Sequence, residues 1–269
     1  MKQVRKTLLA VLFTLVLTVS CVAGVSASAE TDVTYKRADQ MAMYTEEGYN
    51  NTIFGPITIA EACFKTDSKD KGTKVYVVSL AGLDVFNTIQ GGYNGLLDTQ
   101  LAGQDLPGPY QARIEQVMKK QIPKGANVFF YGHSLGGMVA QQLAAKKSVR
   151  DRYNICYTVC FASPIVGGTK AKEGKVVRFI DESDMVPNSS TESQLEALGL
   201  FKNDDIVVRE NGNWGFDVLN AHNQGYAIVD TFKGYDVIGT KRGTASLTID
   251  LDTRVFYKAQ LLKLGVGND

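Results

Sequence analysis

One stretch near the middle of the chain, Ala126–Ala145, limits the possible folds more than any other feature. It opens with a short apolar run at Asn127–Tyr131, continues as Gly-His-Ser-Leu-Gly at 132–136, and ends in good helix formers. A buried strand, a sharp turn and a helix are the context in which the serine of a Gly-x-Ser-x-Gly motif is exposed as a nucleophile. We therefore predict Ser134 as a nucleophile and the Leu135 amide as an oxyanion donor; the plainer alternative is a serine in a glycine-rich turn.

A serine hydroxyl needs a base that removes its proton, and the chain contains only two histidines. His133 is adjacent to Ser134 on the turn, so its side chain points elsewhere, and we interpret it as a packing or hydrogen-bonding residue. His222 is then the predicted base.

The base in turn needs an acid that orients it, and in folds of this kind the acid lies between the serine and the histidine along the chain. Val176–Ile180 has the pattern of a strand, and Asp181 and Asp184 both follow its end. The residues alone favour one of these two aspartates and leave open which.

Four motifs resemble the class 3 lipases, the fungal-type triacylglycerol lipase family of α/β-hydrolases. They are GHSLGG at 132–137, FASPIVGG at 161–168, DMVP at 184–187 and HNQGY at 222–226, within a similar region of about residues 74 to 226. The resemblance implies an α/β-hydrolase fold, with a mostly parallel central sheet flanked by helices. It also implies Asp184 as the acid, a carboxylic ester hydrolase activity on an acyl ester or lipid, and no cofactor.

The chain departs from this family after the expected strand Val75–Leu80. The family usually continues with Arg-Gly-Thr or Arg-Gly-Ser, and the residue after the glycine completes the oxyanion hole. Here the sequence is Ala81-Gly82-Leu83, so the resemblance assigns the second oxyanion donor to the Leu83 amide, without a hydroxyl to anchor it.

The N-terminal segment has the pattern of a signal peptide. Basic residues up to Lys6 precede an apolar run at Leu8–Val19, and small residues that fit a signal-peptidase site follow. We predict a cleaved signal at residues 1–29, one catalytic domain at 30–269, and a secreted or cell-surface protein. Lipid anchoring at Cys21 is the alternative, although the leucine usual three residues before such a cysteine is missing.

Charge and cysteines exclude several classes of partner. Without residues 1–29, the chain has 26 basic and 28 acidic side chains, so no basic field favours nucleic acid. No Cys and His spacing predicts a metal site. Cys156 and Cys160 would lie about 13 Å apart along one strand, too far to bridge, so at most Cys63 pairs with one of them. The oligomeric state is not set by the sequence.

Before the expected strand, Ala38–Glu46 and Ile59–Phe64 are candidate helices. The apolar but glycine-rich stretch Asp84–Pro109 is either a surface loop with a short helix packed on the sheet, or a lid or acyl-pocket wall above the serine. Action at a lipid–water interface therefore also stays open. We predict no role for residues 227–269.

Two other functions stay open beside a lipid esterase. The same triad would serve an esterase or acyltransferase acting on non-lipid acyl esters. A surface binding protein that has kept the fold and lost its activity is the non-enzymatic alternative.

Overall fold

The computed structural model describes residues 31–50, 55–82, 95–167, 170–188, 206–215, 217–227 and 230–259. The expected signal peptide at 1–29 lies outside these residues. So do Leu83, the first part of the stretch Asp84–Pro109 (residues 84–94), and the chain after Ala259. All elements below belong to one compact unit, Asp32–Asp269.

Nine strands of the described chain form one mixed sheet, in the order β1-β8-β2-β3-β4-β5-β6-β7, with β9 paired to β2. The strands are β1 (Asp32–Tyr35), β2 (Ile57–Lys65), β3 (Thr73–Leu80), β4 (Asn127–His133), β5 (Asn154–Phe161), β6 (Lys175–Asp181), β7 (Ile206–Glu210), β8 (Ser246–Asp250) and β9 (Val255–Tyr257). The run β3 to β7 is parallel, whereas β1, β8, β2 and β9 add antiparallel pairs at one edge.

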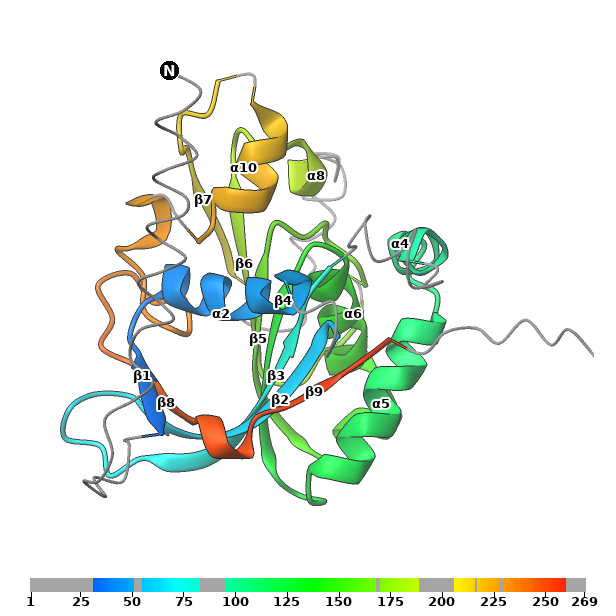
Figure 1. Cartoon of the computed structure of the whole chain (residues 1–269), viewed down its shortest axis with the longest axis vertical. Helices are drawn as coiled ribbons and strands as arrows, with labels where there is room; N and C mark the ends of the chain where they lie inside the picture. The colour runs from blue at the N-terminus through cyan, green and yellow to red at the C-terminus, as the bar shows by residue number, and fades with distance from the viewer. Residues whose placement is uncertain are drawn as a thin grey trace, which may run out of the picture. The chain divides into compact units, whose positions relative to one another are not determined.

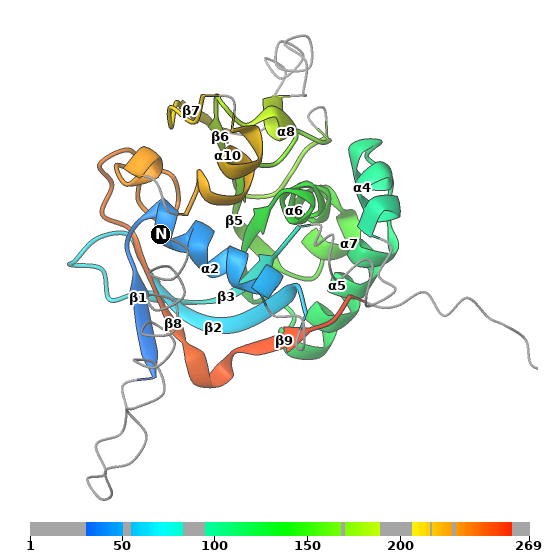
Figure 2. The same ribbon diagram turned by 45° about the horizontal axis from the view of Figure 1, so that its top comes forward.

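Helices cover both faces of the sheet (Figures 1 and 2). The helices are α2 (Ala38–Asn50), α4 (Gly95–Gly103), α5 (Pro109–Gln121), α6 (Leu135–Ala145), α7 (Lys147–Arg150), α8 (Met185–Asn188) and α10 (Val218–Gln224), with 3₁₀ turns η2 (Asp230–Phe232) and η3 (Leu251–Thr253). Helix α2 lies on one face, and α5 and α6 lie on the other. None of the helices in the described ranges is long and apolar enough to span a bilayer.

Strand β4 shows why a continuous apolar run forms the centre of this sheet. Phe129 and Tyr131 pack in the core beneath α2, whereas Val128 and Phe130 pack in the core beneath α5 and α6. Successive side chains of a strand point to opposite faces, so a strand with helices on both sides is apolar throughout. The predicted α/β-hydrolase fold, with its mostly parallel central sheet flanked by helices, is confirmed.

The expectation for the segment before this sheet is only half right. Helix α2 extends the predicted helix at Ala38–Glu46, but Ile59–Phe64 belongs to strand β2 and not to a helix. Strand β2 pairs with β3, β8 and β9, and its β-branched Ile57, Thr58 and Ile59 suit a pleated surface. Sheet pairing has therefore overridden the helix preference of its alanines and glutamate.

The chain tail also contributes to the sheet, since β8 and β9 both pair with β2. This role was not predicted.

The cysteines Cys63, Cys156 and Cys160 are all free thiols. A register shift between β4 and β5 falls beside Cys156, so Cys156 packs in the core beneath α2 while the Cys160 thiol contacts the Gly137 carbonyl on α6.

Candidate active site

The turn between β4 and α6 holds Ser134 in a strained backbone conformation at the carboxyl edge of the sheet. Ser134 has φ 53° and ψ −122°, a region that residues with a side chain rarely adopt. A Cβ on Gly132 would lie 2.6 Å from Gly136, and one on Gly136 would lie 2.0 Å from the Leu80 carbonyl oxygen. The two glycines are therefore required by close backbone contact, as a nucleophile turn demands.

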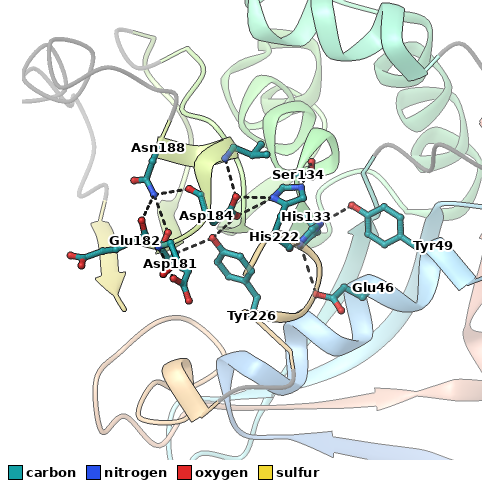
Figure 3. A network of polar contacts seen from close by, with 12 residues as sticks. Glu46, Tyr49, His133, Ser134, Asp181, Glu182, Asp184, Asn188, His222 and Tyr226 are labelled. Carbon is teal, nitrogen blue, oxygen red and sulfur yellow. Dashed lines mark hydrogen bonds and ion pairs between the residues drawn. The ribbon is translucent and has the colours of Figure 1, made fainter. Parts of the chain in front are cut away.

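His222 lies on α10, with its imidazole between a hydroxyl and a carboxylate (Figure 3). Its Nε2 is 3.1 Å from Ser134 Oγ, and its Nδ1 is 2.9 Å and 3.1 Å from the two oxygens of Asp184. The Asp184 side chain is fully buried, and the His222 side chain is 15% exposed. The structure thus brings together the three residues predicted as nucleophile, base and acid.

The contact with Asp184 decides which imidazole nitrogen carries the proton. An ionised carboxylate only accepts hydrogen bonds, so a neutral His222 donates from Nδ1. Its Nε2 then presents a lone pair to the Ser134 hydroxyl. A hydrogen-bonded chain with this polarity is able to take a proton from the serine.

Several groups hold the Asp184 carboxylate in place. The Val186 amide donates to Oδ1 and the Tyr226 hydroxyl donates to Oδ2, each at a distance of 2.9 Å. Burial, and after it the charge of Asp184, raises the pKa of Tyr226 well above its ordinary value, so this hydroxyl keeps its proton. The Asn188 side chain donates to the main-chain carbonyls of Asp181, Glu182 and Asp184, closing the turn that carries the acid.

Asp181, the other candidate acid, binds different partners. Its carboxylate accepts hydrogen bonds from the amides of Ser183 and Gly212. These contacts fasten the loop after β7 to the end of β6. Asp181 is as buried as Asp184, but its carboxylate holds this loop and takes no part in the hydrogen bonds that link Asp184, His222 and Ser134.

A second set of side chains approaches the turn at Ser134 from α2 (Figure 3). The Tyr49 hydroxyl lies 2.7 Å from His133 Nδ1, and His133 Nε2 lies 3.0 Å from the His222 carbonyl oxygen. Glu46 Oε1 lies 3.9 Å from the same Nε2. His133 therefore forms hydrogen bonds, in agreement with its interpretation as a packing or hydrogen-bonding residue. Nothing in the sequence pointed to Tyr49 or Glu46.

Burial controls the charge of this second set. Burial, and after it His222, lowers the pKa of the His133 imidazole to about 3, so this ring is neutral near pH 7. Burial raises the pKa of Glu46 to about 8. Both groups are therefore largely uncharged at neutral pH, because burial disfavours the charged form of an ionisable side chain.

Of the two predicted oxyanion donors, only Leu135 lies in the described part of the chain. It is the first residue of α6, where backbone N–H groups have no intrahelical acceptor and the helix dipole favours negative charge. Leu83 lies outside the described residues, which end before it at Gly82. Within the described ranges, no group of three or more His, Cys, Asp and Glu side chains is arranged to hold a metal ion.

Comparison with known proteins agrees with the fold and gives one family. A family model described as "PGAP1-like alpha/beta domain" matches residues 110–239, just under half of the chain. This stretch contains Ser134, Asp184 and His222. Curated proteins give no match to the chain. The match supports the α/β-hydrolase superfamily and does not single out the class 3 lipases that the motifs resemble. The chain thus has an α/β-hydrolase fold and is similar, over residues 110–239, to PGAP1-like alpha/beta domains.

Proposed function

We propose that the protein is a secreted serine hydrolase that cleaves carboxylic esters of acyl lipids. One observation carries this proposal: Ser134, His222 and Asp184 form a continuous hydrogen-bonded chain that begins on a strained turn between a strand and a helix. The similarity to an α/β-hydrolase family supports hydrolysis in general.

In this proposal, His222 Nε2 removes the proton of Ser134 as Oγ attacks the ester carbonyl carbon. Asp184 holds the ring orientation and stabilises the imidazolium that forms. The imidazolium then protonates the leaving alcohol, and an acyl-enzyme remains on Ser134. Water, activated by the same imidazole, releases the acid and restores the serine.

The tetrahedral intermediate places a negative charge on the former carbonyl oxygen. In the proposal, the Leu135 amide at the start of α6 donates to this oxygen, and the Leu83 amide is the second donor. The geometry at Leu135 supports its role, whereas Leu83 is assigned by resemblance only.

An acyl-lipid substrate is supported by apolar side chains beside the acid. Met185 and Val186 directly follow Asp184 on α8, and their exposed fractions are 67% and 37%. An exposed pair of this kind next to the triad suits contact with an acyl chain. Secretion is proposed from the signal-peptide pattern at residues 1–29, with anchoring at Cys21 as the alternative.

Hydrolysis of nitrophenyl butyrate and nitrophenyl palmitate by the protein and by its Ser134→Ala variant tests the proposal. We expect hydrolysis of at least one ester by the wild-type protein and a loss of at least about 10³-fold in the variant. A higher rate on palmitate supports the lipid substrate, and a strict preference for butyrate favours a non-lipid ester. Equal rates in the two proteins contradict the proposal.

A further inference from the structure

Tyr49 and His133 form a hydrogen-bonded chain that reaches the main chain of His222 from the side opposite Asp184 (Figure 3). Both links are short, at 2.7 Å and 3.0 Å, and His133 is 1% exposed. The ring of Tyr49 meets that of His133 edge-on, with an interplanar angle of 84°. This chain lies outside the proposed proton path.

The acceptor at the far end fixes the direction of every hydrogen bond in this chain. The His222 carbonyl oxygen only accepts, so His133 must carry its proton on Nε2. A neutral imidazole has one proton, so Nδ1 of His133 is an acceptor. The Tyr49 hydroxyl must therefore donate to Nδ1, and this bond stabilises the one tautomer of His133 that is able to hold His222.

Helix α10 needs such an attachment. It spans only Val218–Gln224, and a helix of this length is not stable on its own. The carbonyl of His222 lies in the last turn, where carbonyl groups lack intrahelical donors, and the His133 N–H supplies one. Because His133 is the residue before Ser134, this bond ties the backbone of α10 to the turn that carries the serine.

The hydroxyl of Tyr49 also lies near Ser134. The position that a Cβ on Gly82 would occupy lies 2.3 Å from the Tyr49 hydroxyl oxygen and 2.7 Å from Ser134 Cβ. The phenol of Tyr49 therefore fills the space beside the end of β3, next to the turn at Ser134. Helix α2, which carries this side chain, precedes residues 74 to 226, the region that resembles the lipases.

We infer that Tyr49, acting through His133, is a positioning residue that fixes the backbone of the proposed base His222. The inference rests on the proposed function. Asp184 orients the imidazole of His222 by its side chain, and the Tyr49–His133 pair fixes its main chain. Two attachments at different points of one residue restrict both the place and the rotation of the ring, which sets the contact between Nε2 and Ser134 Oγ.

The test compares Tyr49→Phe with Tyr44→Phe, which removes a hydroxyl from the same helix at a residue packed against Tyr35. Steady-state kinetics should show kcat lowered about five- to tenfold in Tyr49→Phe with KM unchanged, which is the effect of about one hydrogen bond. Tyr44→Phe should stay within about twofold of the wild-type kcat. In a His133→Gln background, Tyr49→Phe should cause no further loss.

The tautomer of His133 gives a readout that does not depend on activity. With two histidines in the chain, ¹⁵N-histidine NMR resolves both rings. Between pH 5 and 8, the wild-type protein should show His133 protonated on Nε2 only, and Tyr49→Phe should show a mixture of tautomers. This measurement also decides the matter if His133→Gln does not fold.

Each of the following outcomes overturns the inference. An unchanged tautomer with the kinetics of Tyr44→Phe would mean that Tyr49 does not act through His133. A raised KM at unchanged kcat would mean that Tyr49 contacts substrate instead. A wild-type protein without hydrolase activity would overturn the proposed function together with this inference, whereas an active wild type matched by Tyr49→Phe would overturn this inference alone.

Discussion

Asp181 and Asp184 are both fully buried near the end of β6, yet only Asp184 contacts His222. Asp184 accepts from the imidazole, while Asp181 accepts from two backbone amides of neighbouring loops. The two aspartates therefore differ in what their loss should do. One change should affect catalysis and the other stability.

Asp184→Asn should lower kcat by about 10⁴-fold, because an amide favours the wrong tautomer of His222 and does not stabilise the imidazolium. Asp181→Asn should leave kcat within about threefold and lower the free energy of unfolding by about 1–3 kcal/mol, since its amide group presents a donor to the Gly212 N–H. Ester kinetics and urea unfolding of both variants check this pair. Equal losses of kcat, or the reverse order, would contradict the assignment.

Tyr226→Phe should reduce both activity and stability. The hydroxyl donates to Asp184 and accepts from the Asp181 amide, so its removal leaves two buried groups without that partner. We expect a decrease of about 1–3 kcal/mol in unfolding free energy and of about tenfold in kcat. Tyr235→Phe is the control, because its hydroxyl binds Glu210 instead. If the two variants have the same kcat, Tyr226 does not hold the acid.

Glu46→Gln should remove part of the pH dependence of stability. Burial raises the pKa of Glu46 to about 8 in the folded protein, from an ordinary value near 4.5. Between these values the folded state binds more protons than the unfolded state, so this contribution to stability is full below pH 4.5 and is lost as the pH rises to about 8.

The neutral amide of Glu46→Gln lacks this loss. Its unfolding free energy should therefore match that of the wild-type protein at pH 4.5 and exceed it at pH 8, as measured by urea unfolding across that range. Glu47→Gln, which removes an exposed carboxylate from the same helix, serves as the control. A constant difference between Glu46→Gln and the wild type at all pH values would show that Glu46 is not held neutral.

Gly136→Ala should prevent the turn at Ser134 from forming, because the added Cβ would lie 2.0 Å from the Leu80 carbonyl oxygen. We expect a loss of several kcal/mol of stability or no folded protein, as overpacking against backbone has no easy relief. Gly103→Ala in α4, where an added Cβ meets no atom within 4 Å, should change stability by no more than about 1 kcal/mol. Circular dichroism during thermal unfolding compares the two, and a folded, stable Gly136→Ala protein would contradict the tight turn.

Much of the fold and the main candidate residues could be predicted because their signals are local. The apolar run of β4, the turn at Ser134 and the helix α6 adjoin one another in sequence, and their periodicities differ clearly. Because the chain has only two histidines, few residues had to be considered as the base. The choice between Asp181 and Asp184 came from the resemblance to the class 3 lipases. The two aspartates are only three residues apart after the same strand, so local sequence patterns could not distinguish them.

The rest depends on tertiary packing. Strand β2 contains helix-favouring residues and is a strand because neighbours on both sides pair with it. Tyr49 and His133 are separated by 84 residues and meet only because α2 packs across the sheet. A tyrosine and a glutamate on a helix carry no signal of such a contact, so Tyr49 and Glu46 were not predicted.

Fluorophosphonate labelling followed by intact mass measurement tests whether His222 activates Ser134. We expect one adduct on the wild-type protein, located on Ser134, and none on Ser134→Ala or His222→Ala under the same conditions. A folded wild-type protein that takes up no label, or an equal adduct on Ser134→Ala, would contradict this activation.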